Sequence, residues 1–320
     1  MKSIAVLTSG GDSPGMNAAI RAVVRFGIHE GMDVYGVHRG YEGLIEGDLE
    51  RMYLRSVGDI LHRGGTILRT ARSERFLCEE GQAQAAELLK SFDIGGLVVI
   101  GGNGSFQGAL ALSRYGINVQ CLPGTIDNDL GYTDFSIGFD TAVNTVLEAI
   151  TRVRDTSSSH DRVVVIEVMG RHCGDIALYS GLAGGAEAVL IPEQEQDIDA
   201  VCAKVLEGIQ NGKRHSIVIR AEGYPVSSQE VVKRLEETTG RDIRLVVLSY
   251  LQRGGSPTLQ DRVLAIECAD RAVRNLKEDV RNQAIGVHRG QIRSMDLAEA
   301  LNTEKKFSTH LNDMVEVLSI

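Results

Sequence analysis

Two aspartates and a threonine follow an apolar stretch in the segment PGTIDND, residues 123–129. If the segment is extended, Thr125, Asp127 and Asp129 point to the same side, and the two carboxylates lie about 6.6 Å apart at the rise of a strand. Like charges at that distance are costly unless a cation or a substrate proton offsets them. Aspartate and asparagine are also favoured in turns and helix caps. The segment is therefore either a pair of carboxylates that meets a cation or a substrate proton, or simply a polar loop.

Two glycine-rich turns each follow a strand-like run and lead into a helical pattern. Residues 7–17 are LTSGGDSPGMN, with a helix expected from about Asn17, and residues 99–105 are VIGGNGS. Glycine lets backbone N–H groups approach a ligand closely, and the N-terminus of a helix favours phosphate. Neither turn matches the GxxxxGK[ST] or GxGxxG pattern. Both turns are therefore either phosphate sites of another kind or ordinary strand-to-helix turns.

Five arginines supply the complementary positive charge near glycine turns or strand ends. A guanidinium group can bind two phosphate oxygens at once, although most arginines of any protein lie on the solvated surface. The five are Arg72, Arg162, Arg171, Arg244 and Arg253. If they meet at one site, they indicate a substrate that carries phosphate.

The elements that must position these residues alternate along the chain. Short apolar runs rich in β-branched residues predict buried parallel strands at residues 4–7, 96–100, 163–166, 216–219 and 245–248. Residues 142–153 have apolar side chains at helical spacing. The pattern predicts an α/β fold with parallel sheets, and the glycine turns fall at the carboxyl ends of strands, where such sheets bind ligands.

Length, charge and cysteine content limit the class of protein further. The chain has 320 residues, 43% of them hydrophobic, which suits about two domains. A net charge of −9 gives no general attraction to nucleic acid or anionic lipid. The five cysteines form no CxxC pair, and no apolar run reaches the length of a membrane span. We therefore expect a cytoplasmic protein without a nucleic-acid or membrane partner.

Taken together, four segments resemble the bacterial ATP-dependent 6-phosphofructokinases: LTSGGDSPGMNAAIR, GTIDND, EVMGRHCGDIAL and LQRGGSPT. The resemblance implies two similar α/β domains, each a mainly parallel sheet sandwiched by helices, with the active site in the cleft between them. The larger, ATP-binding domain would comprise residues 1–138 and about 252–303. The smaller, sugar-phosphate-binding domain would comprise residues 139–251 and about 304–320.

The resemblance also implies an activity. The family transfers the γ-phosphoryl group of ATP to the 1-hydroxyl of fructose 6-phosphate in glycolysis, with Mg²⁺, as a homotetramer regulated by ADP, GDP or phosphoenolpyruvate. Asp127 would be the base that takes the proton from the sugar hydroxyl. Arg72 and the Gly11 backbone would meet the transferring phosphoryl group, and Arg171 would stabilise the charge of the transition state. The implied catalytic residues are Asp127, Thr125, Arg171, Arg72 and Gly11.

Three binding sets are implied by the same resemblance. The ATP set is Gly11, Tyr41, Arg72, Ser73, Gly102, Asn103, Gly104, Ser105 and Gly108. The sugar-phosphate set is Thr125, Asp127, Asp129, Arg162, Met169, Gly170, Arg171, Glu222, Arg244, Tyr250 and Arg253, in which Arg162 and Arg244 would come from a neighbouring subunit. The effector set is Arg21, Arg25, Arg154, Gly185, Glu187, Lys213 and His215.

Some positions depart from the family pattern. Asn103 replaces an aspartate that helps to hold magnesium with the nucleotide, and an amide brings no net charge to Mg²⁺. Tyr250 replaces a histidine that contacts the sugar, and Leu54 replaces an effector-site arginine. Arg220 is an additional charge, and the sequence does not decide whether it pairs with a carboxylate or displaces local packing.

Two glycines bear on the phosphoryl donor. Pyrophosphate-dependent relatives have aspartate and lysine at the positions of Gly104 and Gly124, so the glycines favour ATP. Three hypotheses follow from the whole sequence: an ATP-dependent phosphofructokinase, a kinase for another sugar phosphate, and a weakly active or regulatory relative.

Overall fold

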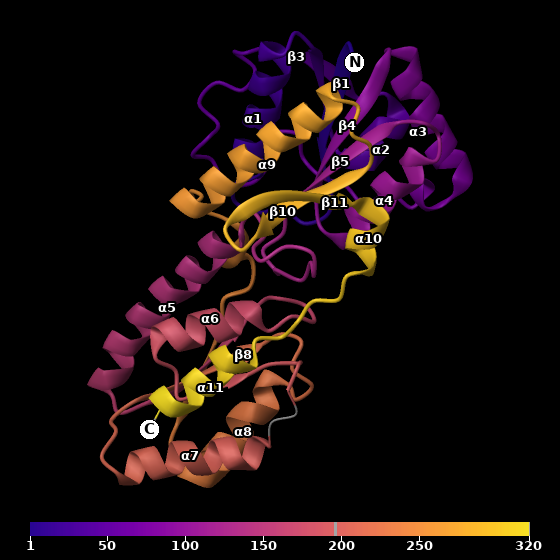
Figure 1. Ribbon diagram of the computed structural model, residues 1–320. Coiled ribbons are helices and arrows are strands. Elements are labelled where there is room, and N and C mark those ends of the chain that lie inside the picture. The colour runs from indigo at the N-terminus through magenta and orange to yellow at the C-terminus, as the bar shows by residue number, and fades with distance from the viewer. Residues whose placement is uncertain (195–196, 320) are drawn as a thin grey trace. The chain divides into compact units, whose positions relative to one another are not determined.

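The computed structural model describes residues 1–194 and 197–319. The chain forms two compact units. The first unit contains Met1–Ile126, Leu130–Thr141 and Arg253–Lys305, and the second contains Asp127–Asp129, Ala142–Gln252 and Lys306–Ile320. Figure 1 labels the helices and some of the strands of both units. The domain ranges expected from the family resemblance stay a prediction.

The first unit is built around one sheet, which has seven strands among the described residues. Its strands are β1 (Ser3–Thr8), β2 (Asp33–Val37), β3 (Leu49–Met52), β4 (Ile94–Gly101), β5 (Asn118–Pro123), β10 (Gln283–His288) and β11 (Gln291–Asp296). Its helices are α1 (Met16–His29), α2 (Gly40–Glu46), α3 (Glu79–Ser91), α4 (Asn103–Ser113), α9 (Leu259–Lys277) and α10 (Leu297–Asn302), with a 3₁₀ turn at Arg75–Leu77.

The order of the strands in this sheet is β11-β10-β5-β4-β1-β2-β3. The five inner strands pair in parallel, whereas β3 and β11 pair antiparallel at the two edges. Along the chain the sheet grows from β1 toward β2 on one side and from β4 toward β5 on the other. The boundary between β1 and β4 is therefore a topological switch point, where open α/β sheets form ligand sites at the carboxyl ends of their strands.

Alternating side chains of the central strands pack on the two faces of the sheet. Ile4 and Val6 of β1 belong to a buried cluster that includes side chains of α1 and α9. Ala5 and Leu7 belong to a second cluster that includes side chains of α2, α3 and α4. Because both faces are covered, the strands are apolar throughout, as the sequence predicts.

The second unit contains, within its described residues, a four-stranded parallel sheet in the order β7-β8-β6-β9. Its strands are β6 (Val163–Val168), β7 (Ala188–Leu190), β8 (Ser216–Ala221) and β9 (Ile243–Val247). Its helices are α5 (Phe139–Ser159), which begins in the first unit, α6 (Asp175–Gly184), α7 (Ile198–Gln210), α8 (Ser228–Thr239) and α11 (Thr309–Leu318), with a 3₁₀ segment at Ser249–Arg253. One face packs against α7 and α8 through a cluster that includes Val165, Val205 and Val231.

The prediction of an α/β fold with mainly parallel sheets is confirmed. Each of the five predicted strands overlaps an observed one, and the helical pattern at residues 142–153 lies in α5. The helix expected from about Asn17 begins one residue earlier, at Met16. The strands β2, β3 and β7 and the hairpin of β10 and β11 were not predicted from the sequence.

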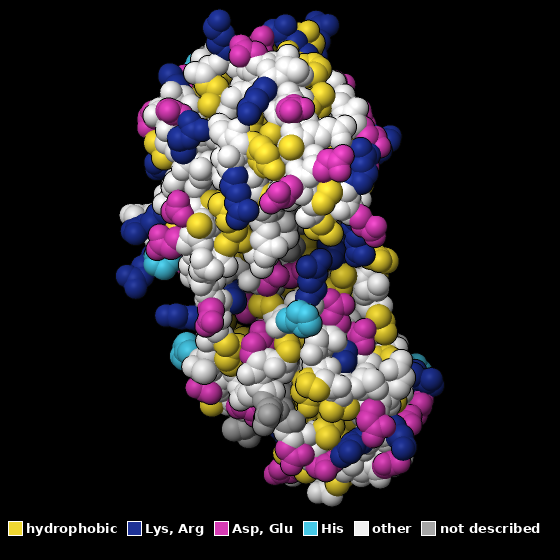
Figure 2. Space-filling view, turned by 90° about the vertical axis from the view of Figure 1, so that its right-hand side faces the viewer, with side chains coloured by type: hydrophobic (Ala, Val, Ile, Leu, Met, Phe, Trp, Pro, Cys, Tyr) yellow, Lys and Arg dark blue, Asp and Glu magenta, His cyan; other side chains and the backbone are white. Residues whose placement is uncertain are grey.

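Within the described part of the chain, no helix has the length and apolar character needed to cross a bilayer. On the face shown in Figure 2, basic and acidic side chains are interspersed.

Candidate functional site

The turn after β1 lies at the switch point of the first sheet. The Ser9 amide donates a hydrogen bond to the carbonyl of Ile100 on β4, at 3.0 Å, so this turn starts at the carboxyl end of both strands. A Cβ on Gly11 would lie 2.5 Å from Nη1 of Arg253. Arg253 also donates to the carbonyl of Asp12, at 3.1 Å. The structure therefore brings two predicted site residues, Gly11 and Arg253, into contact, and a side chain at position 11 would displace the guanidinium group from its present place.

The second glycine turn leads into α4. This helix begins after Gly102, and no side chain caps its N-terminus in the described structure. Asn103 and Gly104 in the first turn are exposed, and a Cβ on Gly104 would meet no atom within 4 Å. Free N–H groups and the positive end of the helix dipole favour a phosphate here.

Tyr41 lies under α4 and is 6% exposed. Its hydroxyl donates a 2.5 Å hydrogen bond to the carbonyl of Ser105, and its ring lies 2.7 Å from the place that a Cβ on Gly108 would take. Burial raises the pKa of Tyr41 well above its ordinary value, so the hydroxyl stays a donor. Tyr41 and Gly108, both predicted for ATP, therefore fix the start of α4 by close packing.

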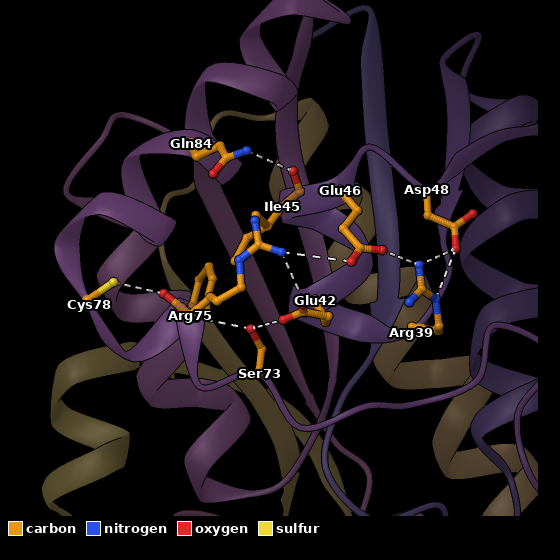
Figure 3. A network of polar contacts seen from close by, with 10 residues as sticks. Arg39, Glu42, Ile45, Glu46, Asp48, Ser73, Arg75, Cys78 and Gln84 are labelled. Atoms are coloured by element: carbon orange, nitrogen blue, oxygen red, sulfur yellow. Dashed lines mark hydrogen bonds and ion pairs between the residues drawn. The ribbon is translucent and has the colours of Figure 1, made fainter.

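The segment that carries Arg72 and Ser73 is fastened to α2 by the network in Figure 3. Glu42 accepts a 2.5 Å hydrogen bond from the Ser73 hydroxyl and a 3.0 Å hydrogen bond from Arg75. Arg72 itself is exposed, and Leu77 is 82% exposed. The Ser73 hydroxyl thus binds Glu42. Glu42 was not predicted as a site residue, because a glutamate on the surface of a helix has no distinguishing sequence pattern.

Thr125 follows β5 on the same edge of the first sheet. Its Cβ lies 3.8 Å from the place that a Cβ on Gly102 would occupy, and Ser136 donates a 2.7 Å hydrogen bond to its carbonyl. Of the first unit's predicted residues, the structure therefore places Gly11, Gly102 and Thr125 along the carboxyl ends of β1, β4 and β5.

Asp127 belongs to the second unit and is 3% exposed. Its Oδ2 lies 3.3 Å from Nε of Arg171, which is largely exposed. Residues 125–129 lie outside the helices and strands, as the alternative of a polar loop expects, but Asp127 is buried in that loop. The segment is not extended at Asn128, which has a φ of 53° and donates a 2.8 Å hydrogen bond to Oδ2 of Asp175. This contact, which spans 47 residues, holds the loop inside the unit and could not be seen in local sequence.

The loop after β6 carries Met169, Gly170 and Arg171. Glu222 accepts hydrogen bonds from the amides of Gly170, at 3.2 Å, and Arg171, at 2.8 Å. The Met169 amide donates a 3.2 Å hydrogen bond to Oε1 of Gln252, a fully buried side chain that was not predicted from the sequence. Arg171 has a φ of 53°, so Glu222 stabilises a backbone conformation that is costly for an arginine.

Each unit separately contains side chains that could be ligands of a magnesium ion. Oδ1 of Asp129 is buried and has no hydrogen-bond partner among the described residues. In the part of the chain that the structure describes, no group of three His, Cys, Asp or Glu side chains could hold a metal ion. Mg²⁺ usually takes one or two carboxylates together with water and substrate phosphates. Asp129 therefore fits such an ion better than Asn103, which offers a neutral amide.

Arg162 and Arg244 lie away from the Arg171 loop. Arg162 directly precedes β6, whereas Arg171 follows its carboxyl end. Arg244 lies on β9, opposite Val164 of β6, and forms a 2.6 Å ion pair with Asp242. One chain thus places these arginines and Arg171 at different ends of the same strands. Tyr250, the remaining predicted sugar contact, is 77% exposed.

The predicted effector residues fall into two groups. Arg21 and Arg25 lie one helical turn apart on α1 in the first unit, and burial, together with the charge of Arg25, lowers the pKa of Arg21. The other residues lie in the second unit. Arg154 donates to the carbonyl of Gly185 at 3.0 Å, and Glu187 accepts the Ile217 amide at 2.5 Å. Lys213 donates to the carbonyl of Ser319 at 3.0 Å, and His215 directly precedes β8.

The comparisons with known proteins agree with this architecture. The family model "Phosphofructokinase" matches residues 3–276. The chain is 57% identical over 320 residues to an "ATP-dependent 6-phosphofructokinase" of Alkaliphilus metalliredigens, and 56% identical over 319 residues to a protein of the same name from Clostridium botulinum; each match covers 100% of both chains. The solved structure of a phosphofructokinase from Saccharomyces cerevisiae superimposes with a TM-score of 0.90 at 37% identity, covering 100% of this chain and 48% of that one.

The fold and the glycine-lined strand ends thus define an α/β phosphotransferase. The chain belongs to the phosphofructokinase family. The resemblance stated from the sequence motifs is confirmed by these matches.

Proposed function

We propose that the protein transfers the γ-phosphoryl group of ATP to the 1-hydroxyl of fructose 6-phosphate, with Asp127 as the base. The observation that carries the proposal is the buried Asp127 carboxylate beside Arg171, in a loop braced by Asn128 and Asp175. The names of the bacterial relatives at 56–57% identity support ATP and fructose 6-phosphate as substrates.

Some residues of the chain would position the reacting groups, and others would stabilise the charge that develops during transfer. Asp127 would accept the proton of the attacking hydroxyl, and the ion pair with Arg171 would orient its carboxylate. The exposed first turn of α4 and the Gly11 turn would bind phosphate oxygens through backbone N–H groups. Arg72 would stabilise the charge that develops on the transferring group. Phosphoryl transfer depends mainly on such alignment and charge stabilisation.

We propose that Asp129 offers a carboxylate oxygen to Mg²⁺, and that Asn103, at the start of α4, offers only a weaker, neutral amide oxygen. The support is the buried, unpartnered Oδ1 of Asp129 among the described residues. A bound Mg²⁺ would neutralise charge on the phosphate oxygens.

The open space at Gly104 favours ATP as the donor. A side chain at position 104 would not clash with the protein, so packing does not require glycine there. The space that glycine leaves open can take a nucleotide phosphate. Gly124 is different, since a Cβ there would lie 2.8 Å from Cγ2 of Ile100. Gly124 is therefore also required by packing, and it says less about the donor than Gly104 does.

Assembly and regulation belong to the same proposal. The positions of Arg162 and Arg244 away from Arg171 support a site completed by a neighbouring subunit, as in the homotetramer that the family resemblance implies. The adjacent positive charges of Arg21 and Arg25 support an anionic effector such as ADP, GDP or phosphoenolpyruvate. We place the protein in the cytoplasm, in glycolysis.

A second candidate is a kinase for another sugar phosphate, because Tyr250 is 77% exposed and free to contact a different sugar. The test is a coupled assay of purified protein, of verified oligomeric mass, with ATP, a wide magnesium range and a panel of sugar phosphates. Preferred turnover of fructose 6-phosphate supports the proposal. Preference for another sugar phosphate selects the second candidate, and absence of turnover with the whole panel leaves a regulatory relative.

A further inference from the structure

Arg220 is a buried arginine whose three hydrogen bonds the sequence does not reveal. It lies on β8 and is 6% exposed. Its Nε donates to the carbonyl of Val226 and its Nη2 to the carbonyl of Tyr224, both at 2.8 Å. Its Nη1 donates to Oε2 of Glu167 at 3.2 Å. The guanidinium group therefore clamps the backbone that leaves β8 and ties it to β6.

Glu167 completes the clamp from the neighbouring strand. It is the register partner of Arg220 in the parallel pairing of β6 and β8. Its Oε2 also accepts a hydrogen bond from the hydroxyl of Ser228, the first residue of α8. Its backbone carbonyl accepts the amide of Leu248, at 3.1 Å, just after β9. Three strands and one helix start are thus joined at the carboxyl edge of this sheet.

The clamped segment carries Glu222, which supports the proposed site. The Glu222 side chain accepts the amides of Gly170 and Arg171, and its own amide donates to the carbonyl of Val168, at 2.8 Å. A Cβ on Gly223 would collide with the Arg171 carbonyl, so the two loops are in direct contact. Movement of the segment at residues 222–226 would therefore release the loop that carries Arg171.

A buried ion pair alone would not require this arrangement, since apolar residues of similar volume often stabilise a fold as well. The guanidinium group, however, reaches two carbonyls of one loop and a carboxylate in fixed directions, which neither lysine nor an apolar side chain can do. The arrangement is suited to fixing a conformation.

We propose that Arg220 is a positioning residue for the sugar-phosphate site: it fixes residues 222–226 so that Glu222 holds the Met169–Arg171 loop in its binding conformation. The kinetic consequence of this inference rests on the proposed function. The structural consequence, an ordered segment at residues 222–226, does not.

The first experiment replaces Arg220 by methionine, with Arg234→Met as the matched control. Arg234 is also an ion-paired arginine of the second unit, but it is 41% exposed and bonds to Asp199 and Glu230 on the surface. We expect Arg220→Met to raise the KM for fructose 6-phosphate about tenfold, the loss of roughly one positioned hydrogen bond, with kcat within about twofold. Amide hydrogen exchange in residues 222–226 should become faster. Arg234→Met should change neither quantity.

Two further variants separate positioning from folding. Arg220→Lys keeps the charge that faces Glu167 but cannot donate to both carbonyls, so it should lose less stability than Arg220→Met and still raise KM. Glu167→Gln with Arg220→Met removes both charges, so the variant keeps its fold if the uncompensated Glu167 is what destabilises the single mutant.

The outcomes are distinct. Faster exchange at residues 222–226 with a raised KM in the folded variants supports the inference. Unchanged exchange and KM, or a fall in kcat in proportion to the folded fraction at constant KM, overturns it. If the wild type itself shows no turnover with fructose 6-phosphate, the proposed function fails, and the exchange measurement alone then decides whether Arg220 orders the segment.

Discussion

Replacement of Gly104 by aspartate tests how the start of α4 is used. A Cβ at this position meets no atom within 4 Å, and the residue is exposed in the first helical turn. The folded state should therefore accept the change. A carboxylate near the N-terminus of a helix stabilises it by about 0.3–1 kcal/mol, and any residue other than glycine or proline improves helix propensity by up to about 1 kcal/mol.

The same carboxylate should weaken ATP binding. If a nucleotide phosphate sits about 4–5 Å away, repulsion at this exposed position amounts to about 1–3 kcal/mol, between the values for water and for a protein surface. That range corresponds to a rise in the KM for ATP of about 5- to 150-fold. Gly104→Ala is the matched control, because it adds the Cβ without the charge.

The assay combines thermal unfolding with ATP saturation kinetics. We expect both variants to unfold at or slightly above the wild-type temperature, and only Gly104→Asp to raise the KM for ATP. If Gly104→Asp leaves that KM unchanged, or if Gly104→Ala raises it equally, the N–H groups and dipole of the first turn of α4 do not bind the nucleotide phosphates.

Two more variants address the metal and the core. Asn103→Asp should lower the magnesium concentration needed for half-maximal activity by several-fold, because a carboxylate adds charge for Mg²⁺; an unchanged magnesium requirement would mean that residue 103 does not contact the ion. Asp261 is 1% exposed and accepts hydrogen bonds from Gly138 and Thr141, and burial raises the pKa of its carboxyl, partly opposed by these bonds. The contribution of the Asp261 carboxyl to the free energy of unfolding is therefore complete below the ordinary aspartate pKa and declines as pH rises through the raised pKa of the folded state. In urea unfolding, Asp261→Asn should lower the free energy of unfolding by about 1–3 kcal/mol near pH 4 and by less at pH 7. A cost that grows with pH would refute this sign.

Local sequence predicted five of the strands and the glycine turns, because a parallel strand covered on both faces must be apolar along its whole length. The hairpin of β10 and β11 was harder to predict. β11 is partly exposed, and Gln283 and Gln291 begin the two strands with polar side chains. The hairpin joins the sheet because β10 pairs with β5, which lies some 160 residues earlier in the chain. No local pattern encodes that pairing.

The site could be predicted only in part for a similar reason. The aspartates of residues 127–129 were visible as unusual chemistry, but their burial depends on the contact between Asn128 and Asp175. Likewise, the partners of Arg220 are two carbonyls and a carboxylate on another strand. Local sequence shows which residues could do chemistry, whereas burial and partners follow from tertiary contacts.

The most direct test of the central claim compares the formation of fructose 1,6-bisphosphate by the wild type and by Asp127→Asn, with saturating ATP, sugar phosphate and magnesium. Asp199→Asn serves as the control, because Asp199 is also paired with an arginine but lies on the surface. The account predicts that Asp127→Asn lowers kcat by about 10²- to 10⁴-fold while the chain stays folded and Asp199→Asn retains wild-type turnover. Turnover of Asp127→Asn within about tenfold of the wild type would contradict the assignment of Asp127 as the base.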